Sequence, residues 1–208
     1  MLLELSKYKN ILWDFDGVIL DSMKVRDLGF ELIFKDFDSK KVNELLDFHR
    51  QNAGWSRYVK IEYFFKNIMN MIYDEDLIKK YANDFSVVMR KELIKKKYLI
   101  HDSLDFIKQN SKKYNFHIVS GSDHVELNFL CDYLGIDSYF LSIQGSPTPK
   151  TKLVKDVLTS NSYKTSYTCL IGDSINDYDA SKANNIRFFG YNNLDLNTLD
   201  KYIKSFSF

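Results

Sequence analysis

The stretch ILWDFDGVILDS, residues 11–22, places two aspartates, Asp14 and Asp16, at the end of an apolar run. The run over residues 10–15 is short and rich in large apolar side chains, which predicts a buried strand of a parallel sheet. Two carboxylates at the end of such a strand repel each other and lose hydration, and both effects are costly. Other groups in the chain must therefore offset their charge.

The rest of the chain changes its hydrophobic period near residue 100. Over residues 22–97 the apolar residues recur at spacings of three and four, which predicts about four helices, with Ser56 and Asp74 as N-caps of two of them. After residue 100 short apolar runs alternate with amphipathic segments. The strands predicted there cover 115–120, 139–145, 167–173 and 186–191, and the helices cover 102–113, 124–134, 150–160 and 175–184. This order predicts an α/β fold with a doubly wound parallel sheet and an inserted helical region.

Composition limits the classes of function. The 208 residues are 45% hydrophobic and 27% charged, with a net charge of +1, which is typical of a soluble globular protein and favours neither a nucleic-acid nor a membrane partner. The N-terminus lacks the pattern of a signal peptide, and no apolar run approaches the ~20 residues of a membrane span. Cys131 and Cys169 lie in apolar patterns and are expected to be reduced core residues. We therefore expect a cytoplasmic protein that acts through a local site.

Polar clusters follow four of the predicted strands. They contain Asp14 with Asp16, Ser120–Ser122, residues 146–152, and Gly172–Ser174 with Asp177. Because ligands bind beyond the carboxyl ends of the strands in such sheets, we expect these clusters to converge on one site.

If the ligand is a phosphate with a divalent cation, the polar clusters have clear roles in binding it. The carboxylates of Asp14 and Asp173, with Asp177 as a further candidate, are hard oxygen ligands of the kind that Mg²⁺ prefers. The Ser120 hydroxyl and the amides of Gly121 and Ser122 can bind phosphate oxygens at a helix start. A lysine at position 150 or 152 can neutralise charge on both the phosphate and a nucleophile.

The ordered motifs resemble those of the phosphatase branch of the haloacid dehalogenase superfamily. DFDGV (14–18) resembles the first motif, IVSGS (118–122) the second, and GDSINDYDAS (172–181) the fourth. The third motif departs from the common form, since GSPTPKTK carries Ser146 where many members have lysine; Lys150 can take that role, with Lys152 as the alternative. The resemblance implies a core domain of residues 1–20 and 98–208, with a helical type 1 cap domain of residues 21–97.

The resemblance also implies a mechanism. Asp14 would be the nucleophile that forms an aspartyl-phosphate, and Asp16 the general acid and base, whose backbone carbonyl also binds Mg²⁺. Dehalogenases lack this second acid because a halide leaves without a proton, so Asp16 favours phosphoryl chemistry. Phosphomutases of the superfamily keep it and stay an alternative, although the β-phosphoglucomutase branch has histidine where this chain has Arg26.

Substrate selection is expected in the cap, where Arg26, Trp55 and Arg57 are the candidate residues. Arg57 suits a second anionic group, and Trp55 suits a sugar face. The predicted substrate is a small phosphorylated metabolite such as a phosphoglycolate-like acid or a sugar phosphate. A different class of function is a catalytically silent module that binds a phosphorylated ligand for regulation, which the altered third motif suggests.

Overall fold

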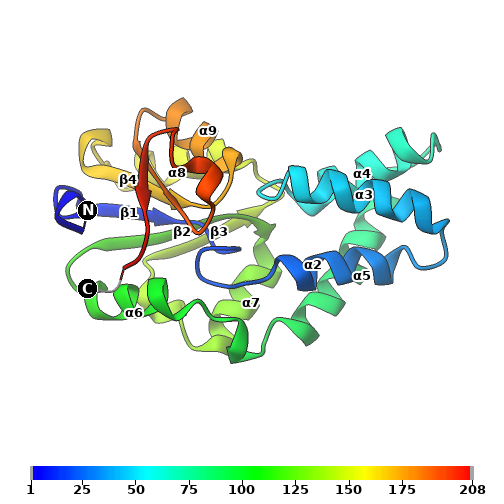
Figure 1. Cartoon of the computed structure of the whole chain (residues 1–208), viewed down its shortest axis with the longest axis horizontal. Helices are drawn as coiled ribbons and strands as arrows, with labels where there is room; N and C mark the ends of the chain where they lie inside the picture. The colour runs from blue at the N-terminus through cyan, green and yellow to red at the C-terminus, as the bar shows by residue number, and fades with distance from the viewer. Residues whose placement is uncertain (1, 207–208) are drawn as a thin grey trace.

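The computed structural model describes residues 2–206 and has two parts, shown side by side in Figure 1. One part, here called the sheet lobe, is built on a parallel sheet. The other, here called the helical lobe, comprises helices α2 to α5 and projects from one end of the sheet.

The sheet has six strands in the order β3-β2-β1-β4-β5-β6, and every neighbouring pair is parallel. The strands are β1 Asn10–Trp13, β2 Asn115–Asp123, β3 Ser142–Ser146, β4 Thr168–Gly172, β5 Arg187–Tyr191 and β6 Lys201–Ile203. This confirms the predicted fold class. Two details differ from the prediction: β3 starts three residues later, because residues 137–139 form a 3-10 turn, and β6 adds an edge strand that was not foreseen.

Helices cover both faces of the sheet, and the alternation of side chains in β1 shows why. Ile11 and Trp13 point to one face, where Trp13 contacts Phe116, while Leu12 points to the other face and packs with Leu170. Figure 1 shows α6 and α7 on the first side and α8 and α9 on the second. These helices are α6 His101–Asn110, α7 His124–Leu134, α8 Lys150–Ser160 and α9 Ile175–Ala183, and the short elements are α1 Leu2–Leu5, η2 Lys96–Tyr98, η3 Asp137–Tyr139, η4 Thr165–Tyr167 and η5 Leu194–Leu196.

The helical lobe contains the four predicted helices. They are α2 Met23–Ile33, α3 Ser39–Gln51, α4 Arg57–Tyr63, which continues into the π-helix η1 Phe64–Ile68, and α5 Glu75–Glu92. The predicted N-caps are confirmed, because the Ser56 hydroxyl accepts from the Tyr58 amide at 3.3 Å and the Asp74 carboxylate accepts from the Leu77 amide at 2.8 Å. Stacked and tilted aromatic rings fill the space between the helices.

The chain passes between the lobes twice, and the two passages lie side by side. The Asp21 amide donates to the Tyr98 carbonyl at 2.7 Å, and the Ile100 amide donates to the Ile19 carbonyl at 2.9 Å. The predicted domain boundaries after residues 20 and 97 lie next to this crossing, and the division into two domains stays a prediction.

Two other expectations concern the interior and the membrane. Cys131 and Cys169 are both buried free thiols, as predicted. None of the helices formed by residues 2–206 is long and apolar enough to cross a membrane.

Candidate active site

Three carboxylates from separate parts of the chain meet at the carboxyl edge of the sheet. Asp14 follows β1, Asp173 follows β4 and Asp177 lies in the first turn of α9, and one oxygen from each lies within 4.8 Å of the others. β1 and β4 are neighbouring strands, and the Asp14 amide extends their pairing by donating to the Ile171 carbonyl at 2.9 Å. The predicted convergence of the first and fourth motifs is therefore present in the structure.

Gly17 makes room for this cluster. Its φ of +72° is in the left-handed region, and a Cβ atom at this position would lie 1.9 Å from Asp173 Oδ2. The glycine of the first motif thus lets the acid of the fourth motif lie directly against the first loop.

Lys150 lies inside the cluster and Lys152 does not. The Lys150 side chain is buried, its Nζ lies 3.0 Å from Asp14 Oδ1, and it also donates to Asp177 Oδ1. Lys152 is exposed and pairs with Asp156 at 2.6 Å, one helical turn away. Of the two lysines considered for the third motif, only Lys150 touches the proposed nucleophile.

Asp177 has partners for both of its carboxylate oxygens. Oδ1 accepts from Lys150, and Oδ2 accepts from the Ser174 amide at 3.1 Å and from the Ser174 hydroxyl, completing a capping box at the start of α9. Asp177 therefore holds Lys150 in place, although its oxygens also lie within reach of the acidic cluster.

The cluster carries more negative charge than Lys150 offsets. Burial is the main cause that raises the pKa of Asp14, to about 7, and the neighbouring Asp177 carboxylate adds to it against the opposing effect of Lys150. Burial and the charges of Asp14 and Asp177 also raise the pKa of Asp173 well above its ordinary value. A divalent cation among these oxygens would remove the excess charge, so the residues fit the Mg²⁺ ion that the motifs imply.

The Asp16 side chain is held by three donors. The hydroxyls of Ser22 and Ser122 donate to its two oxygens, and Arg26 Nε donates to Oδ1 at 2.7 Å. Burial by itself raises the pKa of Asp16, but Arg26 and then the two hydroxyls outweigh that effect and leave the pKa below its ordinary value. Arg26, which was predicted to select the substrate, thus contacts Asp16, the residue proposed as both general acid and general base.

The second motif differs in one respect from its prediction. Ser120, Gly121 and Ser122 do not begin a helix, because β2 continues through a register shift to Asp123, which is the N-cap of α7. Gly121 and Ser122 line the cavity described next, whereas the buried Ser120 is not among its lining residues and its hydroxyl accepts from the Ser122 amide at 3.1 Å.

A cavity lies where the two lobes meet. The sheet lobe contributes Asp14, Asp16 and Asp173 to it, and the helical lobe contributes the cations Arg26, Arg57 and Lys60. Its volume is about 30 Å³, which is room for roughly two water molecules. A second pocket of about 440 Å³ lies beside it and shares the lining residues Ala53, Gly54, Trp55 and Asp173.

Arg57 and Trp55 both line this cavity. Arg57 Nη1 donates to Glu126 Oε2 at 2.6 Å and to the Ser86 hydroxyl at 2.7 Å, while its buried Nη2 has no hydrogen-bond partner among the described residues. Trp55 is 43% exposed and lies edge-on to Phe48. Arg57 is the only one of the two with an unused polar group inside the protein.

Sequence reasoning missed Lys60 and Glu126. Lys60 Nζ is buried, lies 2.8 Å from His49 Nδ1 and donates to the Ala53 carbonyl at 3.1 Å; burial lowers its pKa to about 7. The spacing of three between Arg57 and Lys60 places both on one side of α4 and could have indicated it. Glu126 lies in the first turn of a helix, where an acid is common for other reasons.

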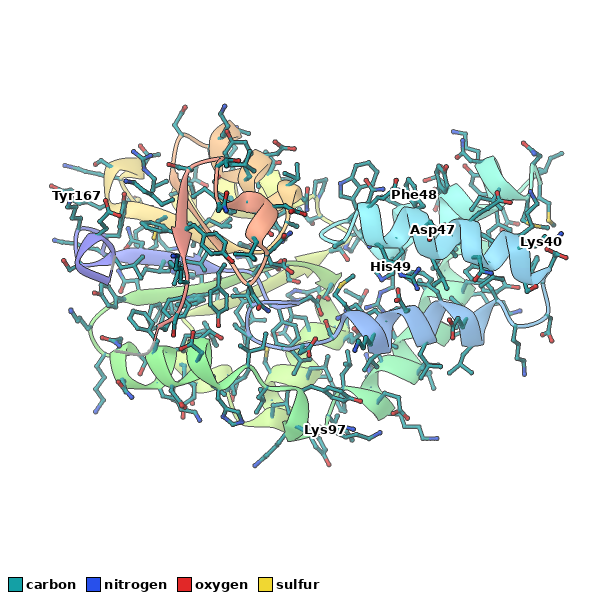
Figure 2. All side chains as sticks on the ribbon, viewed as in Figure 1. Lys40, Asp47, Phe48, His49, Lys97 and Tyr167 are labelled. Carbon is teal, nitrogen blue, oxygen red and sulfur yellow. The ribbon has the colours of Figure 1, made fainter. Side chains whose placement is uncertain are left out.

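Burial of His49 predicts a measurable loss of stability in acid. His49 lies on α3, where Figure 2 labels it, and its ring contacts Phe30 of α2. Burial, followed by the charges of Lys60 and Arg26, lowers its pKa to about 2. The unfolded chain binds a proton near pH 6.5 that the folded protein does not, so stability falls as the pH drops below that value. At pH 5 the loss from His49 is about 2 kcal/mol.

The measurement compares urea unfolding of the wild type and His49→Gln near pH 7.5 and near pH 5. Groups with raised pKa, such as Asp14, change the stability of both proteins alike and cancel in the comparison. The variant should gain about 2 kcal/mol relative to the wild type on going to the lower pH. An equal difference at the two pH values would contradict the assignment of a neutral His49.

The comparison with protein families identifies the chain. Residues 11–191 match the family model described as haloacid dehalogenase-like hydrolase. The chain therefore belongs to this family, and the resemblance drawn from its motifs is confirmed, as is the prediction of a hydrolase.

Solved structures with the same fold are distant in sequence. CbbY from Rhodobacter sphaeroides, in complex with xylulose-(1,5)bisphosphate, has a TM-score of 0.76 at 15% identity over 96% of this chain and 95% of that chain. β-Phosphoglucomutase from Clostridium difficile has a TM-score of 0.74 at 16% identity over 96% and 92%. A predicted phosphoglycolate phosphatase from Haemophilus somnus has a TM-score of 0.70 at 17% identity over 94% and 88%. No match was found among the curated proteins.

Proposed function

We propose that the chain is a Mg²⁺-dependent phosphatase that hydrolyses a small phosphorylated metabolite through an aspartyl-phosphate. The observation that carries the proposal is the position of Asp14, which lies 3.0 Å from a buried lysine and lines the cavity between the lobes. A carboxylate in this place can attack phosphorus, and the lysine can offset charge on both partners.

Each neighbouring residue has a task in this reaction. Asp14 attacks, and Lys150, held by Asp177, stabilises the charge on Asp14 and on the phosphoryl oxygens. Asp16 would give a proton to the leaving oxygen and later take one from the attacking water. Because Arg26 and the two hydroxyls favour its ionised form here, Asp16 must first bind a proton, which requires these contacts to change when the substrate binds. Gly121 and Ser122 line the cavity and would bind phosphate oxygens. The Ser122 hydroxyl, which donates to Asp16 in the structure, would have to turn away from it to do so.

Mg²⁺ would be held by Asp14, Asp173 and the backbone carbonyl of Asp16. The raised pKa values of Asp14 and Asp173 support this assignment, since they reflect charge that a cation would offset. When bound, the ion supplies positive charge against the carboxylates and the transferred phosphoryl group. The helical lobe acts as the cap in this proposal and keeps water away from the site.

The substrate is proposed to carry a second anionic group. Arg57 lines the cavity, and its buried Nη2 has no hydrogen-bond partner within residues 2–206, while the Lys60 side chain lines the same cavity. The CbbY structure, which contains a bisphosphate, supports a doubly anionic ligand for this fold. A carboxylate or phosphate on the leaving group would pair with Arg57 and add a charge-assisted hydrogen bond.

The test measures release of inorganic phosphate from a panel of esters with Mg²⁺ and with EDTA. Phosphoglycolate and ethyl phosphate form a matched pair that differs in the carboxylate. We expect Mg²⁺-dependent release, with kcat/KM for phosphoglycolate higher by roughly tenfold to hundredfold, and Arg57→Gln should remove that preference. A mutase would transfer the group without releasing phosphate, and a silent binding module would give no turnover on any ester; either result would overturn the proposal.

A further inference from the structure

Glu126 connects the two lobes beside the cavity. It lies in the first turn of α7, in the sheet lobe, and its side chain is fully buried. Its Oε2 accepts from Arg57 Nη1 at 2.6 Å, and its Oε1 lies 3.4 Å from Arg26 Nη1. Both arginines belong to the helical lobe, so one carboxylate of the sheet lobe binds two cations of the other lobe.

A role within its own helix does not explain Glu126. The N-terminus of α7 is already capped by Asp123, whose carboxylate accepts from the amides of Val125 and Glu126. A first-turn acid that only stabilised the helix dipole would lie at the surface near the helix end. The Glu126 carboxylate instead points away from its helix to the arginines, at the cost of complete burial.

The arrangement also positions the groups at the cavity. Arg26, besides contacting Glu126, donates to Asp16 at 2.7 Å and to the Ser122 hydroxyl at 2.7 Å. Arg57 is fixed through Nη1, which binds Glu126 and Ser86, and by the Phe85 ring 4.7 Å from its guanidinium carbon. Its Nη2 makes no hydrogen bond to any of the described residues. Arg57 thus takes its position from Glu126, which does not itself line the cavity, and from Ser86. Arg26 is held mainly by Asp16 and Ser122, with Glu126 as a longer contact at 3.4 Å.

The charge of Glu126 matters only while the lobes are packed together. With the lobes packed, Arg26 and Arg57 are buried, and loss of the carboxylate would leave Arg57 as a buried cation without a counter-charge. With the lobes apart, both guanidinium groups can be hydrated. Among the described residues the lobes are also joined by the ion pair of Arg26 with Asp16 at 2.7 Å and by hydrogen bonds from Arg26 to Ser122, from Tyr58 to Asp123 and from Asn176 to Gly54. None of these contacts gives Arg57 a counter-charge, which it takes from Glu126.

We propose that Glu126 is a positioning residue that holds the helical lobe over the cavity and sets the place of Arg57. The role assumes that the cavity is the substrate site proposed above. Without this carboxylate the lobes spend more time apart, and the apparent affinity for the substrate is multiplied by the fraction of molecules that remain packed.

The test measures the distance between the lobes independently of activity. Spin labels on Lys40→Cys and Tyr167→Cys report it, because these residues lie at opposite ends of the molecule in Figure 2 and both are exposed, while the natural cysteines are buried. Glu126→Gln keeps the shape and removes the charge. Asp132→Asn is the matched control, since it removes one negative charge from an exposed position of the same helix.

We expect the wild type and Asp132→Asn to share one distance distribution and Glu126→Gln to shift to longer distances. In kinetics, Glu126→Gln should raise KM by about tenfold or more with a smaller change in kcat. Adding Arg57→Gln to Glu126→Gln removes the uncompensated cation and should return the distances toward the wild-type values. A purely structural effect would lower stability without this rescue.

The possible results separate the two proposals. If the wild type hydrolyses phosphate esters while Glu126→Gln keeps wild-type distances and KM, the role of Glu126 is overturned. If no ester is hydrolysed by the wild type but the distances shift as expected, the proposed phosphatase fails while the contact between the lobes stands. Should Glu126→Gln not fold, Arg57→Gln breaks the same ion pair from the other lobe, and unchanged distances in that variant would equally overturn the role.

Discussion

Asp14→Asn is expected to abolish Mg²⁺-dependent phosphate release, with kcat lower by at least about 10⁴-fold. The amide keeps the size and shape of the carboxylate but cannot form the aspartyl-phosphate. The residual rate would come from binding and charge alone, which do not replace a nucleophile. The measurement is the steady-state release of phosphate from the best ester of the panel.

Folding is not expected to explain that loss. The raised pKa of Asp14 means that its charge opposes folding when no cation is bound, since burial and Asp177 outweigh Lys150. Above pH 7, without Mg²⁺, the variant should therefore unfold at the same temperature as the wild type or at a higher one. Asp21→Asn, at an exposed position seven residues along, is the control for activity. Turnover by Asp14→Asn within tenfold of the wild type would exclude Asp14 as the nucleophile.

The sequence was sufficient for the sheet lobe because its strands are short apolar runs with a functional loop at the end of each. Asp14, Asp16 and Asp173 could be located from their place after β1 and β4, since parallel strands bring these loops to one edge. The edge strand β6 could not be seen, because three residues in a short tail give no period to detect.

The parts of the site that depend on packing between the lobes were not predictable from one sequence. Arg26 and Arg57 were identified as candidates, but their shared partner Glu126 lies about 70 to 100 residues away in the chain and resembles an ordinary first-turn acid. Lys60 was missed because a single lysine in an amphipathic helix is usually solvated. The approach of α2 and α4 to the sheet lobe buries these charges together.

The third-motif lysine shows how a helix boundary distinguishes two candidates that residue spacing left open. α8 begins at Lys150, and two residues along a helix correspond to a rotation of about 200°. Lys150 and Lys152 therefore cannot face the same side. Packing of α8 on the sheet turns Lys150 toward Asp14 and leaves Lys152 beside Asp156 at the surface.

Lys150→Met is accordingly expected to lower kcat by about 10²-fold to 10³-fold, the effect of removing one group that stabilises charge in the transition state. It should also lower the free energy of unfolding by about 3–5 kcal/mol in the absence of Mg²⁺, because Asp14 and Asp177 lose their buried counter-charge. Mg²⁺ should restore part of the stability, since a cation among the carboxylates offsets the same charge.

Lys152→Met is the matched control, with the same change of side chain two residues away. Its ion pair with Asp156 is exposed on both sides, and such pairs contribute at most a few tenths of a kcal/mol. Stability and phosphate release should stay close to those of the wild type. Loss of activity in Lys152→Met together with normal activity in Lys150→Met would reverse the assignment, and it would require α8 to rotate by about half a turn from the orientation that its buried residues Leu153, Val154 and Val157 now fix.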